Sequence, residues 1–172
     1  MKRISGKNLI LIGFMGTGKT EVGRLLAESL GRRLVDTDRL IVEREGKPVR
    51  EIFQDRGEAY FRQVEKKIIG ELSGQSGLVV SSGGGVVLDA DNVARLRESG
   101  YVVWLDAAIT DLEARLAGDT TRPLLAGNTD LAKLYGERRP FYRNAAHVRV
   151  DTTGKPPLAV AAEIIERIRG GT

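Results

Sequence analysis

Short apolar runs alternate with amphipathic stretches along most of the chain. In residues 20–30, Val22 and Leu26 recur at helical spacing and Gly31 follows as a stop signal, so this stretch predicts a helix. The apolar runs are short enough for buried parallel strands. They predict β-strands at residues 8–12, 33–36, 78–82, 101–105 and 147–150.

The stretches between the later strands also favour helices. Pro48 suits a first helical turn, and Thr-Asp-Leu-Glu at 110–113 is a capping box that is expected to open a short helix. Strands that alternate with helices imply one parallel sheet. We therefore predict an α/β fold, a three-layer arrangement in which a five-stranded parallel sheet carries helices on both faces. Further helices are expected at residues 39–45, 48–54, 58–73, 92–98, 130–144 and 157–169.

Composition narrows the function classes. The 172 residues are expected to form a single domain, residues 1–172. The chain has no cysteine and one histidine, which excludes a thiolate metal site, a disulfide framework and a histidine cluster. No apolar run reaches membrane-span length, so no membrane role is expected. The net charge of +4 is dispersed among acidic residues, so we expect no nucleic-acid partner and a cytoplasmic setting.

Residues 13–20 read Gly-Phe-Met-Gly-Thr-Gly-Lys-Thr and match the phosphate-binding pattern G-x-x-x-x-G-K-[ST]. The motif lies between a predicted strand and a predicted helix. Its glycines let backbone N–H groups face phosphate oxygens, and the helix dipole favours negative charge there. Lys19 is suited to the β- and γ-phosphates, and the Thr20 hydroxyl is suited to Mg²⁺. The motif predicts nucleotide binding.

Further polar or glycine-rich groups follow the second and third predicted strands. Asp36 and Asp38 could serve a metal ion and a substrate hydroxyl, or an aspartate could simply cap the following helix. The triplet at residues 83–85 could be a flexible turn, or it could let a ligand approach the backbone closely. Ligands of parallel α/β sheets bind at the carboxyl ends of the strands, which favours a functional interpretation of both groups.

Arginines mark the remaining candidate positions. Arg62 and Glu65 are three residues apart on a helix, so they predict either a surface ion pair or a fork held rigid for an anion. Residues 118–128 have no apolar period and predict a mobile loop, which could be a solvated linker or a lid that brings Arg122 to the phosphoryl group. Arg138 and Arg139 precede Pro140 and present two guanidinium groups.

Together these positions resemble the shikimate kinase family, over nearly the whole chain from Leu9 to about Arg169. The spacing between the blocks is also similar to that of the family. The motifs that carry the resemblance are residues 13–20, Asp36-Thr37-Asp38, Phe61-Arg62 with Glu65, Gly83-Gly84-Gly85, Arg122-Pro123-Leu124-Leu125, and Arg138 two residues before Pro140.

The resemblance implies a P-loop kinase that transfers the γ-phosphoryl group of MgATP to the 3-hydroxyl of shikimate, in aromatic-compound biosynthesis. It implies that Lys19, Asp38 and Arg122 are catalytic, and that Thr20 and Asp36 hold Mg²⁺. It also implies substrate-binding helices at about residues 37–73 and a lid at about 118–128. Separately, we expect the protein to be a monomer. The residues implied for ATP are Gly16, Thr17, Gly18, Lys19, Thr20, Glu21, Arg115 and Arg122, with Arg115 and residues 155–157 beside the adenine; those for shikimate are Asp38, Arg62, Gly83, Gly84, Gly85 and Arg138.

Other classes remain open at the level of the residues. Gluconate also carries a carboxylate, so a gluconate kinase or another small P-loop metabolite kinase is the alternative. A GTPase-like switch is disfavoured because no N-K-x-D base-reading motif follows a strand. A nucleotide-binding module without transfer activity is disfavoured because the residues expected to carry the chemistry are all present.

Overall fold

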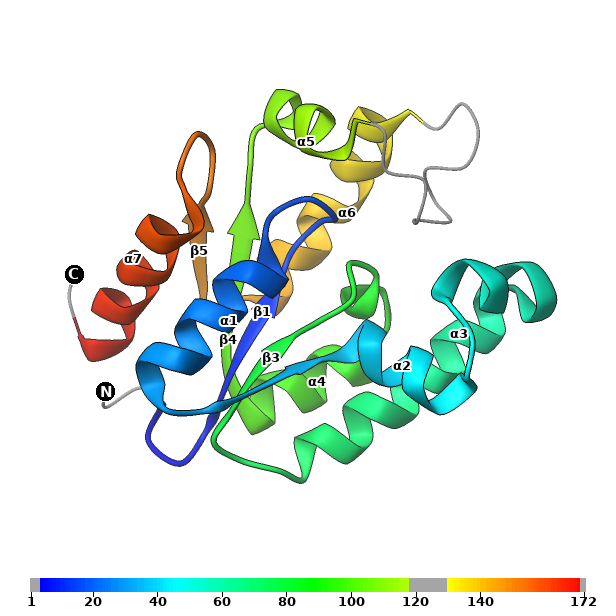
Figure 1. Cartoon of the computed structure of the whole chain (residues 1–172), viewed down its shortest axis with the longest axis horizontal. Helices are drawn as coiled ribbons and strands as arrows, with labels where there is room; N and C mark the ends of the chain where they lie inside the picture. Colours follow the sequence, from blue (N-terminus) through cyan, green and yellow to red (C-terminus); the bar gives the residue numbers. More distant parts are fainter. Residues whose placement is uncertain (1–3, 118–129, 171–172) are drawn as a thin grey trace.

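A single parallel sheet organises the molecule in the computed structural model, which describes residues 4–117 and 130–170 (Figure 1). The strand order is β2-β3-β1-β4-β5, and every neighbouring pair is parallel. The predicted five-stranded sheet is thus confirmed. The strands are β1 (Asn8–Ile12), β2 (Arg33–Asp36), β3 (Leu78–Ser81), β4 (Gly100–Asp106) and β5 (Val148–Asp151).

Helices connect the strands and cover both faces of the sheet. Within the described ranges, no helix is both long enough and apolar enough to cross a bilayer. The helices are α1 (Lys19–Leu30), α2 (Thr37–Glu45), α3 (Val49–Ser73), α4 (Ala90–Ser99), α5 (Ile109–Leu116), α6 (Leu131–Ala145) and α7 (Pro157–Arg169), with a short 3₁₀ helix, η2 (Val86–Leu88).

The period of two along each strand produces two apolar cores. On β1, Leu9 and Leu11 pack with the buried residues of α1 and α7, which lie side by side on one face (Figure 1). Ile10 and Ile12 point to the opposite face, where α3, α4 and α6 supply the apolar partners. All four side chains are almost completely buried, and each contributes about 1.5–3 kcal/mol relative to an exposed position.

The strand register brings the candidate residues to one edge of the sheet. Asp36 is the register partner of Ser81, and Ser81 is the partner of Leu11. The phosphate-binding motif after β1 therefore lies between the segment that follows β3 and the segment that follows β4. This edge is the crevice in which doubly wound sheets bind ligands.

Two predicted helix starts were wrong. The capping box at 110–113 does not form, because α5 already begins at Ile109 and Thr110 lies inside it. The preceding Ala108 donates its N–H to Thr153 Oγ1 at 2.9 Å, so a distant loop replaces the local cap. α2 starts at Thr37, two residues before the predicted start at 39. Asp36 caps it by accepting hydrogen bonds from the Asp38 and Arg39 amides, as the capping alternative for an aspartate predicted.

The predicted break between the helices at 48–54 and 58–73 is present as a kink within α3. Gly57 has φ 80° and ψ 169°, a conformation that glycine tolerates and that interrupts the helical backbone. α4 starts two residues earlier than expected because Asp89 caps it, and η2 was not predicted. The predicted lid at 118–128 lies outside the described residues.

Candidate active site

The phosphate-binding motif forms a loop that ends in the N-terminus of α1. Gly18, the residue before the helix, has φ 86°, which favours glycine. The Lys19 ammonium donates to the carbonyls of Gly13 and Phe14, each at 2.8 Å. These bonds hold the cation over the loop that is expected to bind phosphate.

Two further predicted ATP-binding side chains, Thr17 and Glu21, also have partners within the protein. The Thr17 hydroxyl is buried and donates to the Phe14 carbonyl at 2.8 Å, so this side chain shapes the loop. Glu21 accepts a 2.8 Å hydrogen bond from Arg24 on the exposed surface of α1, and this bond lowers the pKa of the Glu21 carboxyl. Contacts of Thr17 and Glu21 with ATP remain predictions.

Oxygen atoms gather where the loop meets β2 and β3. Thr20 Oγ1 donates to Asp36 Oδ2 at 2.9 Å, and Ser81 Oγ lies 3.4 Å from the same hydroxyl. No group of three histidine, cysteine or acidic residues suited to a metal occurs in the described part of the chain. Mg²⁺ uses one or two protein oxygen ligands together with water and phosphate, so this donor set fits Mg²⁺ bound to a nucleotide.

Beside these oxygen atoms is a cavity of about 350 Å³. It combines a charged wall with an apolar wall, which is typical of a site for a small amphiphilic molecule. The predicted acceptor residues meet here. The lining residues are Asp38, Arg62, Glu65, Gly83, Gly84, Gly85 and Arg138 on the polar side, and Met15, Val42, Pro48, Val49, Phe53 and Phe61 on the apolar side.

The buried carboxylate of Glu65 holds Arg62 in place, so the two residues do not form a surface ion pair. Arg62 Nη1 donates to Glu65 Oε1 at 2.9 Å, and the Glu65 side chain is only 1% exposed. Burial raises the pKa of Glu65, and the nearby Arg62 guanidinium opposes this shift. The backbone at Gly85 approaches so closely that a Cβ there would collide with the Arg62 guanidinium. Arg62 thus forms a rigid fork at the cavity.

Arg138 enters the cavity from α6. It is only 6% exposed, and its guanidinium carbon lies 5.9 Å from the centre of the Phe14 ring. One turn further on, Tyr142 is fully buried and its hydroxyl donates to the Gly84 carbonyl. Burial raises the pKa of Tyr142, while the Arg138 cation opposes that rise. Tyr142 therefore remains a neutral donor that fixes the glycine turn.

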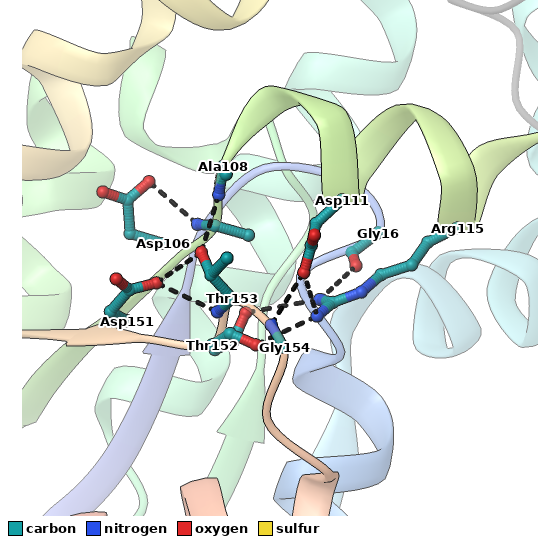
Figure 2. Close-up of polar contacts among 10 residues, drawn as sticks. Gly16, Asp106, Ala108, Asp111, Arg115, Asp151, Thr152, Thr153 and Gly154 are labelled. Atoms are coloured by element: carbon teal, nitrogen blue, oxygen red, sulfur yellow. Dashed lines mark hydrogen bonds and ion pairs between the residues drawn. The ribbon is translucent and has the colours of Figure 1, made fainter.

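Arg115 of α5 lies between the phosphate loop at Gly16 and the turn that follows β5 (Figure 2). Its Nη1 donates to the Gly16 carbonyl at 3.1 Å, and its Nη2 donates to the Thr152 carbonyl at 3.0 Å. Lys155, in the turn predicted to lie near adenine, pairs with Glu163 of α7 at 2.9 Å. Arg115 therefore connects the phosphate loop to the turn after β5.

Comparison with known proteins agrees with this geometry. The family model described as shikimate kinase matches residues 15–169. The chain belongs to the shikimate kinase family. It is 44% identical over 164 residues to the shikimate kinase of Persephonella marina, across 95% of this chain and 99% of the relative. It is 49% identical over 166 residues to that of Gloeobacter violaceus, across 94% of this chain and 92% of the relative.

Solved structures of the family have the same fold. The shikimate kinase from Acinetobacter baumannii in complex with shikimate superposes with a TM-score of 0.93 at 36% identity, over 96% of this chain and 94% of that one. The enzyme from Aquifex aeolicus gives 0.84 at 35% identity, over 95% and 96%. The chain is thus an ATP-dependent small-molecule kinase, and the shikimate kinase prediction is confirmed over the gluconate kinase alternative.

Some of the candidate residues line the cavity in the structure, and others lie elsewhere. Asp38, Arg62 and Arg138 share the cavity with the glycine triplet. Arg139 points elsewhere, because its Nη2 pairs with the buried Asp106 at 3.0 Å. Arg122 lies outside the described residues.

Sequence reasoning missed two functional candidates, Ser81 and Tyr142. Ser81 is the register partner of Asp36, and this relation follows from the pairing of β2 with β3 and not from the sequence. Tyr142 follows Arg138 by four residues and so shares its helix face, which the spacing could have indicated. Each is buried and contacts a predicted site residue.

Proposed function

We propose that this enzyme transfers the γ-phosphoryl group of ATP to the 3-hydroxyl of shikimate with Mg²⁺ bound at Thr20 and Asp36. The observation that carries the proposal is one cavity that opens beside the phosphate loop and presents Arg62, Arg138 and Asp38. A small carboxylated polyol matches two guanidinium groups, a carboxylate and backbone amides better than a nucleobase does.

Arg62 and Arg138 are proposed to bind the shikimate carboxylate. Guanidinium groups can make two parallel hydrogen bonds to a carboxylate, and both arginines are held in place before the substrate arrives. The Glu65 carboxylate orients the first, and the buried position of the second restricts its rotation. Such preorganisation reduces the entropy lost on binding.

Asp38 is proposed to accept a hydrogen bond from the reacting diol and so aim the hydroxyl oxygen at the γ-phosphorus. Phosphoryl transfer then forms the new P–O bond, breaks the bond between the γ-phosphorus and the β-phosphate oxygen to leave ADP, and releases the hydroxyl proton to solvent, directly or through the Asp38 carboxylate. Bound Mg²⁺ would neutralise charge on the β- and γ-phosphate oxygens. Lys19, whose ammonium donates hydrogen bonds to two carbonyls of the loop, is proposed to stabilise the same charge. Arg122, predicted from the sequence, is proposed to add a second cation from the lid.

We also propose a cytoplasmic monomer without a nucleic-acid partner. The site residues that the structure describes all come from one chain, so the proposed chemistry needs no second copy. A cysteine-free chain also suits a reducing compartment, where disulfides do not persist.

The test is ADP release measured with MgATP and, in parallel, shikimate, gluconate and a panel of nucleoside monophosphates. We expect shikimate-dependent release far above the other acceptors, abolished by removal of Mg²⁺ with a chelator. Faster release with gluconate or a nucleoside monophosphate would overturn the acceptor assignment.

A further inference from the structure

In an in-line phosphoryl transfer, the acceptor and the nucleoside half of ATP are expected on opposite sides of the phosphate loop. The attacking and leaving oxygens lie on opposite sides of the transferred group. The acceptor cavity is at the ends of β2 and β3, whereas β4 and β5 are on the other side of β1. The nucleoside half of ATP should therefore leave the loop toward the ends of β4 and β5. The segments there are α5 and the turn at residues 152–154.

Asp111 of α5 is directed at this turn (Figure 2). Its Oδ2 accepts a hydrogen bond from Gly154 N at 2.8 Å and one from Arg115 Nη2 at 3.4 Å. An acidic residue in a first helical turn often serves its own helix. Among the described residues, no side chain caps the N-terminus of α5. The Ala108 amide, which precedes the helix, donates its hydrogen bond to Thr153 and not to Asp111. The carboxylate of Asp111 therefore connects α5 to the turn that follows β5.

Arg115 carries the effect of Asp111 to the phosphate loop. The guanidinium donates to Gly16 on one side and to the carbonyl and hydroxyl of Thr152 on the other, at 3.0–3.3 Å. Thr152 itself is 2% exposed. A long arginine side chain loses rotamer entropy when it bonds to two loops at once. A fixed charged partner that restricts the side chain beforehand reduces this loss. Asp111, one helical turn earlier, is that partner.

The turn also has a second, independent attachment. Thr153 Oγ1 accepts from Ala108 N at 2.9 Å and donates to Asp151 Oδ1 at 2.7 Å. This attachment does not involve Asp111. Loss of the Asp111 carboxylate should therefore change the orientation of Arg115 and Gly154 while the turn stays next to α5.

We propose that Asp111 is a positioning residue for the nucleoside half of ATP, acting through Arg115 and the Gly154 amide. The proposal rests on the proposed function, because it takes the phosphate loop as the ATP site. It assigns a role to a residue that contacts neither the acceptor cavity nor the loop directly.

The test is calorimetric titration of MgADP and, separately, of shikimate into the parent protein and Asp111→Ala. We expect the Kd for MgADP to rise about 5- to 30-fold, the effect of losing one or two hydrogen bonds, with the shikimate Kd unchanged. Glu113→Ala is the matched control, since Glu113 is an exposed acid on the same helix. It should leave both Kd values unchanged. Steady-state kinetics should show a raised KM for MgATP with kcat retained.

Two further variants separate positioning from general damage. Asp111→Asn keeps an acceptor for Gly154 but loses the charge that faces Arg115, so its MgADP Kd should fall between those of the parent and Asp111→Ala. It also serves if the alanine variant does not fold. In Asp111→Ala/Arg115→Ala, the second substitution should cost less than it does alone.

An unchanged MgADP Kd in both Asp111 variants would overturn the inference, as would additive losses in the double variant or equal losses for MgADP and shikimate. Because MgADP binding needs no acceptor, a failure of shikimate as substrate would be seen separately in the ADP-release assay.

Discussion

At the cavity, Arg62 donates a 2.9 Å hydrogen bond to the Glu65 carboxylate, and the Glu65 side chain is only 1% exposed. The same guanidinium also contacts Glu58 at 3.1 Å, but that carboxylate is 50% exposed. The two acids therefore provide an internal comparison. An exposed partner contributes little, whereas removal of one charge from a buried pair leaves the other uncompensated.

Glu65→Gln should weaken shikimate binding about 5- to 30-fold, because Arg62 loses its charged anchor and must be ordered by the substrate. Titration calorimetry with shikimate measures this loss, and MgADP binding should stay the same. Glu58→Gln is the matched control and should bind shikimate like the parent. Equal effects of the two substitutions would contradict the special role of the buried carboxylate.

Tyr142→Phe should raise the KM for shikimate several-fold and lower the free energy of unfolding by about 1 kcal/mol. The phenylalanine ring fills the same space but leaves the Gly84 carbonyl without its hydroxyl donor, so the glycine turn is less constrained. Steady-state kinetics and urea unfolding measure the two effects. A variant that lost stability but kept its KM would show that the turn is fixed by other contacts.

Arg138→Lys should weaken shikimate binding about 10- to 150-fold with little change for ATP, because an ammonium cannot reproduce a planar fork on a carboxylate. The control is a shikimate analogue whose carboxylate is reduced to an alcohol. It should bind poorly to the parent and lose much less in the variant, since the same contact is deleted twice. Additive losses would mean that Arg138 does not touch the carboxylate.

Lys19→Ala should lower turnover at least about 100-fold, as does removal of other groups that stabilise transition-state charge. The ammonium also bonds the Gly13 and Phe14 carbonyls, so we expect a small loss of stability as well. Single-turnover kinetics gives the rate, and shikimate titration confirms an intact acceptor site. Turnover close to that of the parent would argue against phosphoryl transfer at this loop.

His147 should make folding pH-dependent. Its Nδ1 accepts a hydrogen bond from Val102 N at 2.9 Å, which requires an unprotonated nitrogen. Burial and the nearby Arg97 and Lys7 charges lower its pKa. The unfolded chain then takes up this proton more readily than the folded protein. Stability is therefore retained above about pH 6.5, the unfolded value, and falls as the pH drops toward the lowered folded pKa.

Melting curves of the parent and His147→Asn across pH 5–8 measure this effect. Asparagine offers an acceptor oxygen near the Nδ1 position but does not titrate. The Tm of the parent should fall relative to that of the variant below about pH 6.5. A constant difference between the two Tm values over this range would contradict the prediction.

Local signals in the sequence determined the sheet and the phosphate loop. The continuous apolar run at residues 8–12 and the glycine-rich motif at residues 13–20 are local features of the chain, so both could be interpreted without a partner segment. Family motifs also placed Asp38, Arg62 and Arg138 in one site. Helix starts were less predictable: the Thr110 capping box did not form, and the Ala108 amide is bound instead by Thr153, 45 residues away in the chain.

Only the tertiary structure decided what spacing left open. Arg62 and Glu65 at i and i+3 could have formed a surface pair, but Glu65 is buried and the Arg62 guanidinium packs closely against Gly85 at the cavity. The same holds for Ser81, Tyr142 and Asp111, whose partners lie on other strands and loops. Hydrogen bonds between distant segments depend on how the layers pack, and burial sets the protonation of the groups that make them. No local pattern in the chain encodes either property.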